Sequence, residues 1–385
     1  MLSVAVTGTN GKSSVVHFLR QIWNYADFEC ASLGTVGLFV GNHQIKSDEL
    51  DIPNLTTPGI ESFHKVINFL LNKEITHFAF EASSHGLTQG RIPQIMLSAA
   101  AFTNFGHDHL DYHKTEDCYF ESKLILFKDI LKNDKLAVVY GDHSQIYENV
   151  YKYNQNIMTF GFNKNNSIRA QNIQQFPSYI KFDLVIKDKL TRNIKIKIFG
   201  EFQILNIMCA IALAHACGLA FDVIINTLHK ITGLEGRMEM VATHNNGFIY
   251  VDYAHTADGF KQILETFKKF CRGKLICVFG CGGNRDTSKR YLIGKAAAEI
   301  ADIAIVTNDN PRNEDPTIIR KEILIGCPNG IEISNRKEAI KYAIESITPN
   351  DFVAILGKGH ETTQIYKDKI INHNDKEEVL KYCRS

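Results

Sequence analysis

Residues Val4 to Ser14 read VAVTGTNGKSS and combine an apolar run with a glycine-rich turn and a Lys-Ser pair. Backbone N–H groups at such a turn, together with a helix amino terminus, can hold phosphates. Lys12 can reach the terminal phosphates, and the hydroxyl of Ser13 can bind Mg²⁺. The general phosphate-loop pattern has a glycine where this chain has Val6, so that pattern alone is not matched. We predict a nucleotide site here, and a tight strand-to-helix turn without a ligand is the alternative.

Two further polar groups follow apolar runs. Glu81, in the run Phe80 to His85, should lie at the carboxyl end of a strand, where ligands bind in open α/β sheets. A carboxylate there suits Mg²⁺, although a solvated loop residue is the simpler interpretation. The run Asn104 to His113 contains three histidines and two aspartates. With no cysteine ligands and no H-E-x-x-H helix, we favour a Mg²⁺ and triphosphate environment over zinc, with one or two of these groups coordinating.

A third motif, Leu55 to Gly59, reads LTTPG and has the residue types of a helix start. It predicts Thr57 as the N-cap and Pro58 as the first helical residue. The same hydroxyls and N–H groups can also bind an anionic substrate, so both interpretations stay open.

The first ~130 residues alternate β-rich runs with amphipathic helices, which predicts a parallel sheet covered by helices. From Ser167 to Phe199 polar and apolar residues alternate, which predicts a small antiparallel sheet with one wet face. The Asn/Lys-rich stretch Asn154 to Asn166 is expected to be a loop. The predicted elements are strands over Leu2–Thr7, Ile75–Ala82 and Leu97–Asn104, and helices over Lys12–Tyr25, Thr115–Leu131, Gln203–Cys217 and Phe221–Ile231.

The segment Thr232 to Arg237, with two glycines after a helix, predicts a domain boundary, giving domains 1–234 and 235–385. A second βα series follows, with an amphipathic helix around Phe260 to Phe267. We therefore expect an α/β protein with a P-loop ATPase-like first domain and a Rossmann-like second domain. The strands predicted in the second domain are Phe248–Tyr253, Leu275–Phe279, Ile303–Thr307, Ile331–Ser334 and Phe352–Leu356.

The composition is that of an ordinary globular protein, with 385 residues, 44% hydrophobic and 22% charged, and a formal net charge of +1. This balance does not call for nucleic acid or an anionic membrane surface. The longest apolar stretch, Ala210 to Phe221, is interrupted by His215, so no transmembrane helix is expected. Because a glycine-rich loop begins at Gly8, we expect no signal peptide either. We expect a cytoplasmic protein. The nine cysteines form no Cys-x-x-Cys pair and are expected to be reduced structural thiols.

Taken together, these motifs resemble the Mur ligases, the ATP-dependent amide-bond-forming enzymes of peptidoglycan precursor synthesis. Gly8 to Ser13 is the family's form of the phosphate loop, and Gly200 to Asn206 is similar to its adenine-side segment, with Gln203 in place of the usual Asn. Gly236 to Glu239 and Asp252 to His255 resemble its entry to the carboxyl-terminal domain, although Ala257 replaces a proline. The resemblance implies ATP contacts from Gly8, Thr9, Asn10, Gly11, Lys12, Ser13, Asn206, Arg237, Asp252 and His255.

Within the family, the chain is most similar to the branch that adds meso-diaminopimelate. The shared motifs are Thr56-Thr57-Pro58, Ser83-Ser84-His85, Gln89-x-Arg91, Asp309-Asn-Pro-Arg312 and Gly357-Lys-Gly-His-Glu361. The branch implies binding of a muramoyl dipeptide by Thr56, Thr57, Ser84, Gln89 and Arg91. It implies binding of diaminopimelate by Arg285, Asp309, Asn310, Arg312, Gly357 and Glu361.

Arg285 and Arg312 each follow a predicted strand end, so both can face one crevice. Arginine binds carboxylates bidentately, and diaminopimelate differs from lysine by a far carboxylate, whose neighbouring ammonium Glu361 and the backbone near Gly357 would hold. The alternative is that Arg312 anchors its own loop through Asp309 or Asp315.

The resemblance also implies a metal site with two Mg²⁺, with Ser13, Glu81, His109 and a carbamylated Lys123 as ligands. Lys12, Lys123 and His109 would be the catalytic residues. From the residues alone, Lys123 reads as a solvated helix residue. The implied reaction joins diaminopimelate to the D-glutamate of UDP-N-acetylmuramoyl-L-alanyl-D-glutamate through an acyl phosphate.

One departure from the family is the layout, because Mur ligases carry an amino-terminal domain that binds UDP and this chain begins at the phosphate-loop strand. That layout resembles the folylpolyglutamate synthetases, which are the alternative enzyme class. A nucleotide-binding pseudo-ligase is the alternative outside enzymes. We expect a monomer with small-molecule substrates and neither nucleic-acid nor membrane partners.

Overall fold

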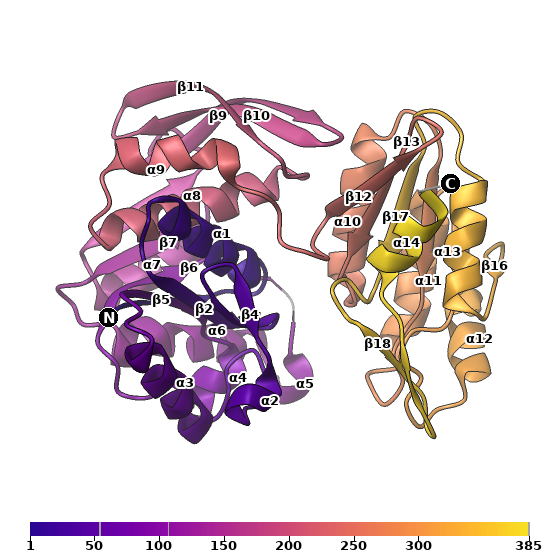
Figure 1. Cartoon of the computed structure of the whole chain (residues 1–385), viewed down its shortest axis with the longest axis horizontal. Helices are drawn as coiled ribbons and strands as arrows, with labels where there is room; N and C mark the ends of the chain where they lie inside the picture. The colour runs from indigo at the N-terminus through magenta and orange to yellow at the C-terminus, as the bar shows by residue number, and fades with distance from the viewer. Residues whose placement is uncertain (54, 107, 384–385) are drawn as a thin grey trace. The chain divides into compact units, whose positions relative to one another are not determined.

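The computed structural model describes residues 1–53, 55–106 and 108–383, and the chain divides into two compact units (Figure 1). Unit 1 comprises residues 1–174 and 179–234. Unit 2 comprises residues 175–178 and the chain from residue 235 onward.

Unit 1 is built on a sheet of eleven strands within the described residues. The strands from β8 through β7, β6, β1 and β5 to β2 are parallel, and β3 and β4 extend the sheet in antiparallel pairs. In sheet order the strands are β11 (Lys189–Ile196), β10 (Tyr179–Ile186), β9 (Ile168–Phe176), β8 (Ile157–Gly161), β7 (Leu136–Tyr140), β6 (Leu97–Phe102), β1 (Leu2–Thr7), β5 (His77–Glu81), β2 (Cys30–Gly34), β3 (Gly37–Val40) and β4 (His43–Ile45).

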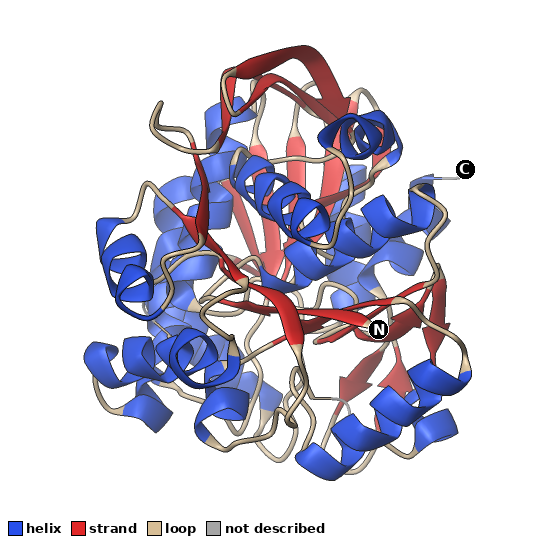
Figure 2. Ribbon diagram, turned by 90° about the vertical axis from the view of Figure 1, so that its left-hand side faces the viewer, coloured by secondary structure: helices blue, strands red, loops and turns tan. Residues whose placement is uncertain are grey.

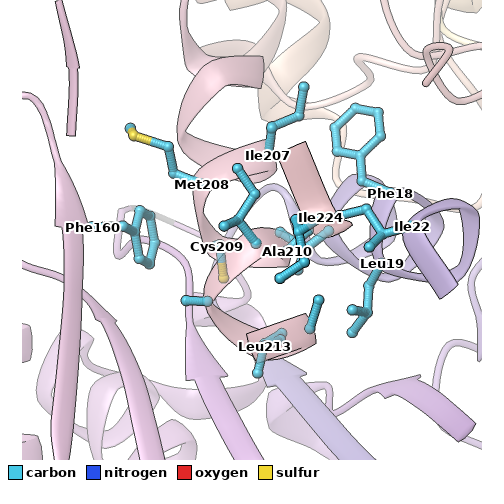
Figure 3. Close-up of a cluster of buried hydrophobic side chains, with 14 of the residues drawn as sticks. Phe18, Leu19, Ile22, Phe160, Ile207, Met208, Cys209, Ala210, Leu213 and Ile224 are labelled. Atoms are coloured by element: carbon cyan, nitrogen blue, oxygen red, sulfur yellow. The ribbon is translucent and has the colours of Figure 1, made fainter. Parts of the chain in front are cut away.

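Helices cover both faces of this sheet (Figure 2). Successive side chains of a strand point to opposite faces, so Val4 and Val6 of β1 lie in one apolar core and Ala5 lies in the other. The first core is filled by α1 (Lys12–Tyr25) and α8 (Phe202–Ala216), whose apolar side chains gather in Figure 3. Because α8 is apolar on nearly every side, it is buried against α1 and the sheet.

The second core lies under α3 (Ile60–Asn72), α6 (Glu116–Ile125) and α7 (Ser144–Tyr153). The remaining helical segments of unit 1 are α2 (Ser47–Leu50), α4 (Ser84–Thr88), α5 (Leu110–His113), a π-helix over Leu126–Ile130, α9 (Phe221–Thr227) and a 3₁₀ turn over Leu228–Lys230.

In its described residues, unit 2 contains a six-stranded sheet in which the β12 and β13 pair is antiparallel and the other pairs are parallel. In order the strands are β12 (Glu239–His244), β13 (Gly247–Asp252), β17 (Phe352–Leu356), β14 (Leu275–Phe279), β15 (Ile303–Val306) and β16 (Ile331–Glu332). The other elements are α10 (Ala257–Phe270), α11 (Ser288–Ile300), α12 (Pro316–Gly326), α13 (Arg336–Glu345), α14 (Asp375–Cys383) and the hairpin β18 (Thr363–Ile365) and β19 (Ile370–Asn372).

The last strand of this sheet, β17, inserts between β13 and β14. Such a reversal of strand order leaves a crevice at the carboxyl ends of the parallel strands, which is where ligands bind in open α/β sheets. The loops after β13, β14, β15 and β17 therefore meet at one edge.

The α/β class, with a mainly parallel sheet early in the chain and a second such sheet after it, is confirmed, but the small separate antiparallel sheet predicted between them is not. The antiparallel strands from Ser167 onward do not form a separate sheet, because β9 pairs with β8 and continues the parallel one. The expected loop Asn154 to Asn166 contains β8, whose buried Met158 and Phe160 give it a core-facing side. The helix expected over Thr115–Leu131 changes to π geometry at Leu126.

The predicted start of α3 is also wrong. The N-cap is Gly59 and the first helical residue is Ile60, so neither Thr57 nor Pro58 begins the helix. The Thr57 hydroxyl instead donates to the carbonyl of Glu81 at 2.8 Å. Among the described residues, no helix is both long and apolar enough to cross a membrane.

Candidate active site

The glycine-rich loop between β1 and α1 is shaped by two glycines at which a side chain would clash. A Cβ on Gly8 would lie 2.0 Å from Thr103 Oγ1, and one on Gly11 would lie 2.3 Å from Asn206 Oδ1. Gly11 has φ 84° and precedes α1, and within the described residues no side-chain hydrogen bond caps the helix there. The first N–H groups of an uncapped helix suit an anion. The loop therefore retains the features of a phosphate site and has Asn206 packed against it.

Residues after the neighbouring strand β6 hold this loop in place. Asn10 donates its N–H to Asn104 Oδ1 at 2.8 Å, and the Thr103 hydroxyl donates to the Asn10 carbonyl at 2.6 Å. Thr9 donates its N–H to the Asn104 carbonyl at 2.9 Å. Thr103 could not be singled out from the sequence, because its role arises from the pairing of β6 with β1.

Two lysines meet at the start of the loop. Lys12 Nζ and Lys123 Nζ each donate to the Gly8 carbonyl at 2.9 Å, and Lys12 also donates to the Thr9 carbonyl. Lys123 is only 1% exposed, and its Nζ lies 4.2 Å from the centre of the Tyr119 ring. Burial, and then the charge of Lys12, lower the pKa of the Lys123 ammonium well below its usual range. Lys123 is thus a buried residue of the site and not the solvated helix residue that its sequence context alone indicates.

Glu81 ends β5 and is buried at 1% exposure. Its carboxylate accepts hydrogen bonds from the N–H of Thr35 at 2.8 Å and from the Thr35 hydroxyl at 3.2 Å. Ser13 and Glu81 line one small cavity of about 10 Å³. A hydroxyl and a carboxylate are hard oxygen donors of the kind Mg²⁺ prefers, so these two residues fit that ion. Thr35 carried no signal in the sequence, since it comes from the β2–β3 hairpin, which was not expected.

His109 has φ 54°, and its side chain is 46% exposed. Its Nε2 lies 3.5 Å from Asp108 Oδ2, and its ring centre lies 4.8 Å from that of His85. Burial lowers the pKa of the His109 imidazole and the Asp108 carboxylate opposes this, while His85, Lys12 and Lys123 lower it further. A neutral imidazole is the form that binds metals. His107, in the same run, lies outside the described residues.

In the ranges that the structure describes, no three His, Cys, Asp or Glu side chains are close enough to hold a metal ion between them. The oxygen donors beside the phosphate loop therefore offer only part of a coordination shell. Mg²⁺ keeps several water ligands and uses few protein ligands with substrate phosphates, so this incomplete set is consistent with that ion.

The residues implied for dipeptide binding gather at the start of α4. The Thr57 hydroxyl lies 3.0 Å from Ser83 Oγ, and Arg91 Nη1 donates to the Thr57 carbonyl at 3.1 Å. Arg91 Nε also donates to Gln89 Oε1 at 2.8 Å. Ser84 is the first residue of α4, which is capped by Ser83. The hydroxyl of Thr56 lies 3.0 Å from that of Thr35, which places this group of residues next to Glu81.

In unit 2, the carboxylate of Asp252 at the end of β13 holds the backbone of its neighbours. It accepts from the N–H of Met238 at 2.7 Å and of Ala254 at 2.6 Å. Burial raises the pKa of Asp252, and the Arg237 charge opposes this. The Arg237 guanidinium lies 4.5 Å from the centre of the Tyr253 ring, and its buried Nε has no hydrogen-bond partner in the described part of the chain. His255 stacks its ring edge-on against Tyr253. Arg237, Asp252 and His255 are thereby brought together within unit 2.

The loops after β15 and β17 are joined by side-chain hydrogen bonds. Asn310 Nδ2 donates to Glu361 Oε2 at 2.8 Å, and Lys358 Nζ donates to the same Glu361 oxygen at 2.7 Å. Gly357 has φ 110°, and a Cβ there would lie 3.0 Å from Asp309 Oδ2. The Asp309 to Arg312 loop and the Gly357 to Glu361 loop are thus in direct contact.

Arg312 uses one guanidinium nitrogen to hold the loop after β14. Its Nη1 donates to the carbonyl of Gly283 at 2.8 Å and to that of Asn310 at 3.4 Å. In the described residues its anchors are these carbonyls and not the carboxylates of Asp309 or Asp315. Arg285, on the same loop as Gly283, is exposed. Arg312 also borders an open depression of about 800 Å³, which is lined by Asn284, Arg312, Asn313, Ile365, Tyr366, Lys367, Asp368, Lys369 and Ile370.

Comparison with known proteins agrees with this arrangement. Residues 6–214 match the Mur ligase middle domain, and residues 236–359 match the Mur ligase glutamate ligase domain. A UDP-N-acetylmuramoyl-L-alanyl-D-glutamate–2,6-diaminopimelate ligase of Rickettsia bellii is 42% identical over 381 residues, which is 97% of this chain and 79% of that protein.

Solved structures give the same result. A structure of a ligase of the same description has a TM-score of 0.71 and 30% identity, covering 100% of this chain and 78% of its own. A folylpolyglutamate synthase/dihydrofolate synthase of Yersinia pestis, solved with AMPPNP and a manganese ion, has a TM-score of 0.71 at 15% identity, covering 92% and 86%. The second likeness concerns the fold alone. Since the two domain matches and the 42% identical relative extend over nearly the whole sequence, the chain belongs to the Mur ligase family.

Proposed function

We propose that the chain is an ATP-dependent ligase that joins meso-diaminopimelate to the D-glutamate carboxylate of UDP-N-acetylmuramoyl-L-alanyl-D-glutamate, a step of peptidoglycan precursor synthesis. The observation that carries this proposal is the convergence of Asn310, Arg312 and Glu361 at the carboxyl edge of the unit 2 sheet. These residues supply the donors and the acceptor that an amino-acid head group with a carboxylate and an ammonium requires. The name of the 42% identical relative supports the same substrate.

In this reaction unit 1 binds the phosphates of ATP. The loop from Gly8 to Ser13 and the uncapped start of α1 hold the phosphates, and Lys12 neutralises their charge. A carboxylate oxygen of the dipeptide attacks the γ-phosphorus in line, ADP leaves, and an acyl phosphate forms. The diaminopimelate amine then attacks the acyl carbon, loses a proton, and expels inorganic phosphate as the amide bond forms. Arg237, Asp252, His255 and Asn206 are the further ATP contacts of this proposal.

Mg²⁺ would be held by Ser13 and Glu81, with His109 and a carbamylated Lys123 as further ligands. When bound, it supplies positive charge that stabilises the transferring phosphoryl group. Carbamylation of Lys123 is supported by its position, since the amine is buried beside the cation of Lys12 at the phosphate loop. Addition of CO₂ to the amine, with loss of a proton, converts it to a carboxylate-like oxygen ligand.

The dipeptide would bind beside Glu81, where Thr56, Thr57, Ser84, Gln89 and Arg91 gather. Unit 1 would therefore bind the phosphates of ATP and the dipeptide, which is the acyl donor, and unit 2 would bind the incoming amino acid and supply further ATP contacts. The fold likeness to a folylpolyglutamate synthase does not favour folate as a substrate, because at 15% identity it extends to the fold alone.

The test is phosphate release from ATP by the full chain. We expect release that depends on both the UDP-linked dipeptide and meso-diaminopimelate. Dependence on a folate and glutamate instead would assign the chain to the other enzyme class, and ATP binding without turnover under any substrate pair would identify a pseudo-ligase.

A further inference from the structure

Lys358 is a lysine whose side chain is fully buried within unit 2, between the two loops of the amino-acid site. Its Nζ donates to Glu361 Oε2 at 2.7 Å and to Asn310 Oδ1 at 3.0 Å. Lysine is almost never fully buried unless it is paired. With 0% exposure Lys358 cannot reach a ligand itself, so its effect must pass through the two residues that it contacts.

The first of these residues, Asn310, has its amide orientation fixed by the lysine. Asn310 Oδ1 accepts two hydrogen bonds, from Lys358 Nζ and from the N–H of Ile365, each at 3.0 Å. Both partners are obligate donors, so the atom that faces them must be the oxygen. One Nδ2 hydrogen is used by Glu361. Given these contacts among the described residues, the Asn310 side chain has its second N–H left for a ligand, which is a donor and suits a carboxylate.

The second residue, Glu361, is given the opposite polarity. Its Oε2 accepts from both Lys358 Nζ and Asn310 Nδ2, whereas Oε1 takes part in no hydrogen bond found in the described residues. The side chain is 30% exposed, so Oε1 can be reached from solvent. A carboxylate oxygen in this position is an acceptor, and it suits an ammonium group.

We propose that Lys358 is a positioning residue that sets the polarity of the amino-acid site, turning Asn310 into a donor for the far carboxylate and Glu361 into an acceptor for the far ammonium of the incoming amino acid. This inference rests on the proposed function. The Lys358 ammonium has two effects. It keeps Asn310 Oδ1 turned toward the interior, and it donates to Glu361 Oε2, so that Glu361 Oε1 remains for the substrate.

The test compares Lys358→Met with the wild type on two amino acids. Meso-diaminopimelate carries both far groups, and 2-aminopimelate keeps the reacting amine and the far carboxylate but lacks the far ammonium. We expect Lys358→Met to raise KM for diaminopimelate at least about tenfold, with KM for ATP within about twofold. We also expect the preference for diaminopimelate over 2-aminopimelate, as a ratio of kcat/KM, to fall by at least about tenfold.

The matched control is Lys268→Met, which removes another lysine of unit 2 whose partner, Asp302 at 2.6 Å, lies outside the site. This control should change neither KM for diaminopimelate nor the preference for diaminopimelate over 2-aminopimelate. If Lys358→Met does not fold, Lys358→Gln keeps two N–H donors but removes the positive charge, and it should lower the substrate preference by at least about threefold.

Three results distinguish the possibilities. If the wild type turns over diaminopimelate and the folded Lys358→Met variant keeps the same substrate preference, the role of Lys358 is wrong and the proposed function still holds. Equal rises of KM for ATP and diaminopimelate, with the preference intact, would overturn the role of Lys358 as well, because a general loss of structure would explain them. A wild type without any diaminopimelate-dependent phosphate release contradicts the proposed function.

Discussion

Replacing Arg312 by alanine tests how the site selects its amino acid. In the structure Nη1 is committed to the Gly283 and Asn310 carbonyls, and the other edge of the guanidinium makes no hydrogen bond in the described residues. That edge can hold one carboxylate through two parallel N–H groups. A hydrogen bond to a charged group contributes about 1.5–3 kcal/mol. At ~1.36 kcal/mol per tenfold change, losing even one such bond should weaken the binding of diaminopimelate about tenfold or more.

The assay is phosphate release at saturating ATP and dipeptide while diaminopimelate is varied. We expect Arg312→Ala to raise KM for diaminopimelate at least about tenfold, to leave KM for ATP within about twofold, and to reduce the discrimination against L-lysine. The matched control is Arg272→Ala, since Arg272 is exposed and precedes the amino end of β14, opposite to the site.

The backbone needs its own control, because Arg312 has φ 55°. A left-handed conformation costs a non-glycine residue roughly 1–2 kcal/mol, and Asn tolerates it better than Ala. Arg312→Asn should therefore match Arg312→Ala in KM while melting closer to the wild type. A KM for diaminopimelate that stays within about twofold in both variants would refute the reasoning, and a wild type that uses L-lysine as well as diaminopimelate would refute the specificity.

Three other predictions follow from buried groups. Lys123→Ala should abolish turnover, and acetate should partly restore it by filling the vacated space. The control is Lys128→Ala, on the exposed side of the next turn, which should be active. Full activity of Lys123→Ala without acetate would contradict a metal-ligand role. Glu81→Gln should raise the Mg²⁺ concentration needed for half-maximal turnover at least about tenfold, and an unchanged Mg²⁺ titration would exclude Glu81 from the metal site. Burial by itself raises the pKa of Asp375, but the contacts of its carboxylate with Arg336 at 2.7 Å hold that pKa below the ordinary 3.8. The ionised carboxylate therefore stabilises the fold above about pH 4, and this stabilisation is lost as the pH falls below that value. Asp375→Asn should cost about 3–5 kcal/mol in urea unfolding at pH 7, and the cost should shrink progressively as the pH falls below about 4; a loss that does not depend on pH would contradict the linkage.

The sequence predicted most accurately those elements whose pattern of apolar residues is compatible with one type of secondary structure. Strands Leu275–Phe279 and Phe352–Leu356 and helix Lys12–Tyr25 have the predicted bounds, because fully buried strands read as continuous apolar runs and the helix follows a glycine turn. The hairpin strands β3 and β4 were not predicted, since they are short and partly exposed. The strand β8 is hidden in an Asn/Lys-rich stretch, because only alternate residues face the core.

The chemistry of the site was predictable only as far as residue types allow. The sequence indicated a phosphate loop, a carboxylate at a strand end and an arginine beside a crevice. Long-range partners could not be predicted in this way. Thr35 holds Glu81 from 46 positions away, and Lys358 orients Asn310 from 48 positions away. Thr57 had a strong local signal for an N-cap, but tertiary contacts with Glu81 and Ser83 override it.

The open sheet of unit 1 has a consequence for the behaviour of the protein at high concentration. A sheet that does not close into a barrel offers unpaired backbone groups along its outermost strands, where another chain can add a strand. Here one outer strand, β4, is only three residues long. The other, β11, carries Lys189, Arg192 and Lys195, and a register shift in its pairing with β10 interrupts the ladder. The short edge strand β4 and the positively charged edge strand β11 should prevent the sheets of two molecules from pairing edge to edge. Replacing the three β11 cations with valines should lower the solubility of the protein.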